Sequence, residues 1–212
     1  MKKEMIAKSV KLTNIQLRQH NTLLRKNLKR IVSCSTDNEK AQERMDEIEK
    51  LIFDAPSLKV MFDAVVTQGR RIFEINFITV ALENELKEFY PENYHHGEKN
   101  VYLGSENIFF DDMDGIDSNF SNGEPALRGN LKKGSDKFFP NGISRRVRSE
   151  AIVPVHANGR IIAVLNFGSQ DNARFMEGYG FRFLMRLARL VALKIEMFRV
   201  LGPEFGGENT GG

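Results

Sequence analysis

Two apolar runs separated by one tight reversal place the strongest constraint on the fold. Residues 149–156 and 160–168 flank Ala157-Asn158-Gly159. Because Asn and Gly both tolerate positive φ, this spacing predicts a hairpin of two neighbouring antiparallel strands. Residues 161–165 are apolar throughout, which is typical of a central strand covered on both faces.

Helical patterns bracket this hairpin. Residues 58–72 follow the helical apolar period, and residues 175–201 carry an apolar band wider than one sheet face needs. We expect a second helix or a second subunit to cover that surplus. Residues 75–83 and 101–110 are predicted strands, and residues 125–139 carry weak strand signals. The element order predicts an α+β domain with an antiparallel sheet flanked by helices.

The first 36 residues differ from the rest in charge. They hold nine Lys or Arg and one Glu, whereas residues 37–212 hold 22 basic and 27 acidic residues. Apolar residues recur there every seven positions, at Val10, Leu17, Leu24 and Ile31, which predicts a thin coiled-coil-like stripe on a helix that is marginal alone. Nucleic-acid phosphates, an anionic membrane surface and a second copy of the arm are all possible partners.

A boundary is predicted after this arm. Residues 33–38 are predicted to break the helix, and Thr36 with Glu39 fits a capping box that would start a new helix from about 38 to 53. We therefore expect a basic helical or partly disordered arm (1–36), a linker or dimerisation helix (37–56), a globular domain (57–201) and a disordered glycine-rich tail (202–212).

Several classes of function find no support in the sequence. The one cysteine, Cys34, rules out an intramolecular disulfide and a multi-cysteine zinc site, and is best read as a surface or interface thiol. Adjacent His95 and His96 are poor joint ligands, and residues 111–117 fail the spacing of a calcium loop. No Walker loop or nucleophile elbow occurs. We expect no metal, no cofactor and no catalysis.

Neither a signal peptide nor a membrane span is expected. Residues 5–17 mix apolar and polar side chains, and no 18-residue apolar run occurs. With a single thiol, this favours a cytoplasmic protein.

The segments 148–155 (RSEAIVPV) and 159–171 (GRIIAVLNFGSQD), followed by Arg174-Phe175, form a distinctive pattern. It resembles the bacterial "domain of unknown function 484" family, a GAF-like group, over residues 38–200. The resemblance implies a sheet with helices on one side and a pocket on the other, and helices that often pair subunits. Glu150 and Asn166 stand where small or apolar residues are commoner in that family. Its enzymatic or bilin-binding relatives imply a cysteine in the domain body, and this body has none.

A ligand pocket, if present, is expected around the hairpin and the turn that follows it. The candidate ligand-binding residues are Arg148, Ser149, Asn166, Phe167, Ser169 and Arg174. The Ser and Asn side chains would hydrogen-bond, an Arg would meet an anionic group, and the Phe would supply an apolar wall. The alternatives are turn and capping chemistry at residues 168–171 and a charged sheet edge at residues 145–148.

The favoured hypothesis is a homodimeric GAF-like regulatory or signalling module that binds a small molecule or a protein partner. Its dimer contacts would be the N- and C-terminal helices. Two alternatives remain: a structural interaction protein without a ligand, and a nucleic-acid-binding protein that uses the basic arm.

Overall fold

The computed structural model describes residues 2–89, 107–113, 115–120, 123–140, 142–176 and 182–201. The chain divides into two compact units, residues 1–43 and 44–212, and we call the second unit the body. The histidine pair, residues 101–106 of a predicted strand and the glycine-rich tail lie outside the described residues. None of the described helices has both the length and the apolar character needed to cross a bilayer.

The first helix, α1 (Lys2–Asp54), is continuous, so the predicted break at residues 33–38 is wrong. No Pro or Gly occurs before Pro56 to end it. The predicted capping box is also wrong, because the Thr36 hydroxyl donates back to the Val32 carbonyl (3.1 Å). This hydrogen bond to the preceding turn lets a Thr remain inside a helix.

The last turns of α1 belong to the body. Met45, Ile48 and Ile52 are buried there. The ammonium of Lys194 donates to the carbonyl of Phe53 (2.9 Å), which satisfies one of the free carbonyls at the end of the helix. After Pro56, the Ser57 side chain accepts a hydrogen bond from the Val60 amide and caps helix α2 (Leu58–Ile72), as the apolar period predicts.

The remaining elements form one five-stranded sheet and a closing helix. They are β1 (Phe77–Glu83), the 3-10 helix η1 (Asn84–Phe89), β2 (Ile108–Asp111), η3 (Ile116–Asn119), β3 (Ala126–Arg128), η4 (Ile143–Arg146), β4 (Ser149–Ala157), β5 (Arg160–Ser169) and α3 (Arg182–Leu201). The strand order is β2-β1-β5-β4-β3.

The predicted hairpin is confirmed. Strands β4 and β5 pair antiparallel from Ser149↔Ser169 to Ala157↔Arg160, and Asn158 and Gly159 take φ values of 51° and 79°. The α+β class is confirmed as well. The sheet is mixed rather than wholly antiparallel, because β2 runs parallel to β1. A parallel neighbour needs a long connection, and residues 84–107 separate β1 from β2 in the sequence.

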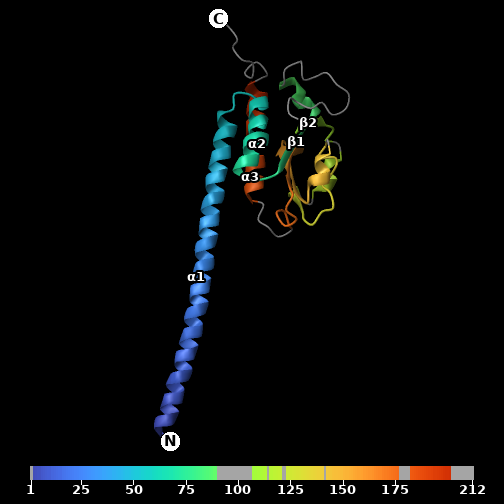
Figure 1. Cartoon of the computed structure of the whole chain (residues 1–212). Helices are drawn as coiled ribbons and strands as arrows, with labels where there is room; N and C mark the ends of the chain where they lie inside the picture. Colours follow the sequence, from blue (N-terminus) through green and yellow to red (C-terminus); the bar gives the residue numbers. More distant parts are fainter. Residues whose placement is uncertain are drawn as a thin grey trace. The chain divides into compact units, whose positions relative to one another are not determined.

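The two faces of the sheet are covered differently. Helices α2 and α3 lie on one side, as Figure 1 shows. The middle of this helix-covered face is apolar, and its residues are Ile78, Val80, Leu82, Ala151, Val153, Val155, Leu165 and Phe167. The buried hydroxyls of Ser149 and Ser169 lie on the same face, at the ends of β4 and β5. The opposite, loop-covered face packs against irregular chain and forms a second apolar cluster with Phe138 and Phe139.

Helix α3 uses only part of its apolar band on the sheet. Leu184, Leu187, Val191 and Ile195 are buried, while Leu193, Met197 and Val200 are exposed. The surplus predicted from the sequence is therefore present. The helix starts later than predicted, because Phe175 and Met176 are not helical.

Candidate functional site

Two of the predicted site residues, Ser149 and Ser169, are buried at the ends of β4 and β5. The Ser149 hydroxyl donates to the Asp171 carbonyl (2.6 Å). The Ser169 hydroxyl donates to Asn76 Oδ1 (3.4 Å) and accepts from the Asp171 amide (3.0 Å). Both hydroxyls are therefore engaged in the turn that follows β5, as the capping alternative describes.

The two predicted arginines also contact backbone. Arg148 is half-buried, and its Nη1 donates to the carbonyls of Lys132 (3.0 Å) and Arg145 (2.8 Å). Arg174 is exposed, and its Nη2 donates to the Phe73 carbonyl (2.9 Å). These contacts hold loops in place.

Asn166 and Phe167 do not share a pocket. They are neighbours on β5, so their side chains point to opposite faces of the sheet. Phe167 packs in the core on the helix-covered face. Asn166 is bonded toward the loop-covered face, through Thr79 to Phe138. The six predicted residues therefore do not line one pocket. The two serines lie at strand ends, the two arginines bind loop carbonyls, and Asn166 and Phe167 lie on opposite faces of the sheet.

Buried polar side chains gather on the loop-covered face. Thr79 and Asn166 are fully buried cross-strand partners, and Glu150 is 1% exposed. Asn166 Nδ2 donates to the carbonyl and hydroxyl oxygens of Thr79 (3.3 and 3.2 Å), and the Thr79 hydroxyl donates to the Phe138 carbonyl. Among the described residues no donor reaches Asn166 Oδ1. An unpartnered buried acceptor is rare and costly, about 1–3 kcal/mol.

Residues 129–140 and 142–147, which we call the covering segment, lie over this polar group. The Glu150 carboxylate accepts from the Ser135 amide (2.9 Å) and pairs with Arg128 (3.2 Å). Burial raises the Glu150 pKa, an effect that the amide and Arg128 oppose. Gly168 lets the segment approach the sheet, because a Cβ there would lie 2.9 Å from a ring carbon of Phe139.

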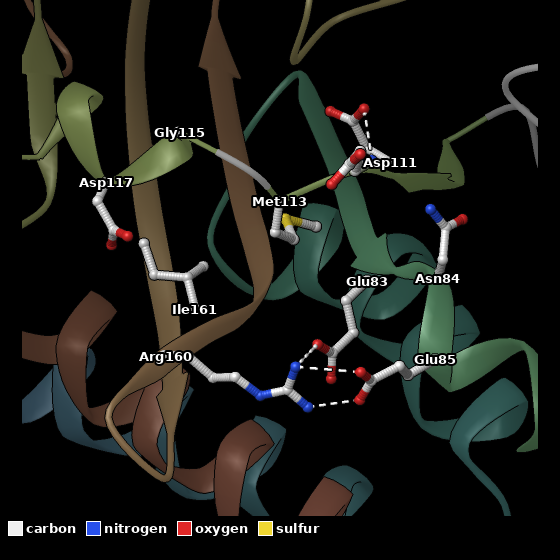
Figure 2. Close-up of a pocket in the computed structure, with 10 residues that line it drawn as sticks. Glu83, Asn84, Glu85, Asp111, Met113, Gly115, Asp117, Arg160 and Ile161 are labelled. Atoms are coloured by element: carbon white, nitrogen blue, oxygen red, sulfur yellow. Dashed lines mark hydrogen bonds and ion pairs between the residues drawn. The ribbon is translucent and has the colours of Figure 1, made fainter.

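A separate cavity of about 320 Å³ opens where β1 ends and β5 begins. Its lining residues are Glu83, Asn84, Glu85, Asp111, Asp112, Met113, Gly115, Asp117, Arg160 and Ile161. Figure 2 shows the Arg160 guanidinium directed at the carboxylates of Glu83 and Glu85, with Asp111 and Asp117 on the far side. The lining thus carries five carboxylates and one guanidinium.

Ion pairs connect this cavity to the last helix. Glu83 pairs with Arg160 (3.2 Å) and with Arg199 of α3, and Arg199 also pairs with Glu196 (2.7 Å). Burial raises the pKa of Glu83, and the two arginines oppose the shift. The hydrogen bond from Arg160 lowers the pKa of Glu85. Within the described residues no group of three His, Cys, Asp or Glu is placed to hold a metal ion.

Sequence reasoning missed Thr79, Glu83 and Arg160. The Thr79–Asn166 and Glu83–Arg199 contacts join residues 87 and 116 positions apart. The pairing of β1 with β5, which was not predicted, brings Thr79 to Asn166. The packing of α3 on the sheet brings Arg199 to Glu83. A Thr and a Glu within the apolar run of residues 75–83 were the one available signal.

Solved structures similar to the chain share the GAF fold. A free methionine-R-sulfoxide reductase from Neisseria meningitidis, in complex with its substrate, is 19% identical, with a TM-score of 0.54 over 76% of this chain and 92% of that one. The GAF domain of a phosphoenolpyruvate-protein phosphotransferase from Coxiella burnetii is 14% identical, with a TM-score of 0.54 over 77% of this chain and 97% of that one.

A third structure, the GAF domain of the Acinetobacter phosphotransferase, is 15% identical, with a TM-score of 0.50 over 76% of this chain and 95% of that one. At such identities the likeness establishes the fold alone, which confirms the GAF-like prediction. No curated protein matches the chain. The family model described as "Protein of unknown function, DUF484" matches residues 5–200. The chain therefore belongs to the DUF484 family.

Proposed function

We propose that this chain is a cytoplasmic GAF-like regulatory module that acts as a homodimer and binds a small molecule on the loop-covered face of its sheet. The observation that carries the proposal is the difference between the two faces. Thr79, Asn166 and Glu150 are buried on the loop-covered face, whereas the middle of the helix-covered face is apolar and its buried hydroxyls, Ser149 and Ser169, lie at the strand ends.

Buried polar groups are costly unless each finds a partner. A sheet face that only supported a fold would gain from a dry interface on both sides. Asn166 Oδ1, which no donor in the described part of the chain reaches, fits a position that a bound molecule completes. A ligand for this position carries a hydrogen-bond donor and an apolar body, because the surrounding cluster is apolar.

Among the six sequence-predicted residues, Asn166 is the one we retain as a ligand contact. Ser149, Ser169, Arg148 and Arg174 hold the neighbouring turns, and Phe167 supports the strand from the helix-covered side. The covering segment must shift to admit a ligand, since Phe138 now receives the hydrogen bond of Thr79.

The helices would carry the signal onward. Helix α3 is linked to the sheet by Arg199 and Glu83, and a ligand that favours one packing of this helix would bias any partner bound to it. Two similar structures are GAF domains of a phosphotransferase, and a regulatory module is compatible with the fold that they share with this chain.

One observation favours the alternative of a structural protein without a ligand. Phe138 and Phe139 are fully buried, so the chain's own side chains fill the loop-covered face. In that case the polar group would serve only to fix the covering segment in one position.

A thermal-shift panel of nucleotides, amino acids and small carboxylates separates the two. We expect at least one compound to raise the melting temperature of the wild-type chain and to lose this effect in Asn166→Leu. The Leu substitution keeps the branched shape and removes the polar atoms, but its methyl groups are larger and the donor to Thr79 is lost, so we expect it to destabilise the chain by about 1–3 kcal/mol while leaving it folded.

Ser169→Ala is the control, because it removes a hydroxyl from the same strand outside the polar group. If a compound stabilises wild type and Asn166→Leu equally, it binds at another site. If Arg160→Gln then abolishes its effect, the site is the cavity of Figure 2. A panel without any shift supports the structural alternative.

A further inference from the structure

The described side chains of residues 17–43 are all exposed. This part of α1 lies in the first unit, so the surface can be considered without the body. Leu17, Leu24 and Leu28 recur at spacings of seven and four, which places them on one helix face. Leu17 is 54% exposed and Leu28 is 62% exposed.

A basic stripe runs beside this apolar stripe. Arg18, Arg25 and Lys29 each follow one of the leucines by one position, so they lie about 100° around the helix from them. At 1.5 Å per residue the basic stripe is about 17 Å long, which matches about five base pairs of duplex. Pairing through the leucines would leave this stripe open.

Nothing in the arm neutralises this charge. Between Glu4 and Asp37 the sequence contains no acidic residue. A second copy of the arm would only double the positive charge, and that self-repulsion opposes pairing until a polyanion is bound. The complementary partner is therefore a dense array of negative charges.

The lack of aromatic residues in the arm indicates which kind of polyanion it can bind. The first aromatic residue of the chain is Phe53. Helices that lie in a membrane surface use Trp, Phe and a broad apolar face, and proteins that bind single strands stack bases on aromatic rings. Neither is available in the arm. Duplex phosphates need only Lys and Arg, and a major groove about 12 Å wide admits a helix.

We propose that the Arg18-Arg25-Lys29 stripe binds the phosphate backbone of double-stranded nucleic acid, without reading its sequence. This goes beyond the ligand-binding function of the body and does not depend on it. Binding at the phosphates makes affinity strongly dependent on salt.

The test is fluorescence anisotropy of the full chain with a labelled DNA duplex of arbitrary sequence across a salt series. Arg18→Glu/Arg25→Glu/Lys29→Glu should weaken binding by more than about tenfold and reduce the slope of log affinity against log salt by about three. Far-UV circular dichroism checks that the arm stays helical.

The matched control is Lys132→Glu/Arg145→Glu/Arg182→Glu, which makes the same change in net charge on exposed body residues. It should keep most of the affinity and the slope. Equal loss in both variants, or no binding by wild type, overturns the proposal. So does tighter binding to the labelled single strand, or binding to phosphatidylglycerol vesicles without binding to duplex.

Discussion

At the scale of single residues, Glu150 sets a testable dependence of stability on pH. Burial raises its pKa in the folded protein above the ordinary value of 4.5. Between the unfolded and folded pKa values the native state therefore holds more protons, so this group's contribution to stability falls as pH rises through that window. Above the folded pKa the whole cost of the buried charge is present.

Glu150→Gln should remove this dependence. The amide oxygen can still accept from Ser135, and no charge is buried at any pH. We expect urea unfolding from just below pH 4.5 to neutrality to show a flatter curve for the variant, and the two curves to approach each other at acid pH. Parallel curves would contradict the assignment. Glu83 is intact in both proteins, so its own raised pKa cancels in the difference.

The candidate site was predictable only in part, and the reasons lie in individual residues. Neighbouring residues of a strand point to opposite faces, so the sequence already indicated that Asn166 and Phe167 of β5 would not line one pocket. Ser169 and Arg174 form hydrogen bonds with Asn76 and Phe73, which are about a hundred positions away in the sequence. No local pattern indicates such partners.

At the scale of elements, the continuity of α1 can be tested at Ser35. Proline there would remove a hydrogen bond inside the helix and clash with the preceding turn, at a cost of about 3 kcal/mol. Ser35→Pro should lower the helical circular dichroism relative to Ser35→Ala. The melting temperature of the body should not change, because residue 35 belongs to the first unit. Equal helical signals from the two variants would mean that the helix is already interrupted there.

The elements show why some of the fold was readable from the sequence. The β4–β5 hairpin depends on a turn whose two residues are adjacent in the chain, so its signal is local. The run of Ser, Thr, Asp and Asn at residues 33–38 is ambiguous, since these residues cap helices or bond backward within them. The parallel direction of β2 is set by a crossover, which no strand pattern reports.

At the scale of the whole molecule, dimerisation should depend on the outer face of α3. Leu193 is 64% exposed, with Met197 and Val200 beside it. Leu193→Glu should weaken self-association in sedimentation velocity while changing the stability of the monomer by less than about 0.5 kcal/mol, as for other surface changes. Met176→Glu, which alters an exposed apolar residue outside α3, is the control. A wild-type chain that sediments as a monomer at every concentration contradicts the homodimer.

The difference between the two faces of the sheet also predicts how the sequences of related proteins diverge. The apolar middle of the helix-covered face is constrained by volume, so relatives should exchange Ile, Val, Leu and Phe there and little else. Positions 79, 150 and 166 are constrained by hydrogen bonding. Their residue types should change together in relatives that bind a different ligand. An alignment of the family would then show slow drift on one side of a strand and abrupt replacement on the other, residue by alternate residue.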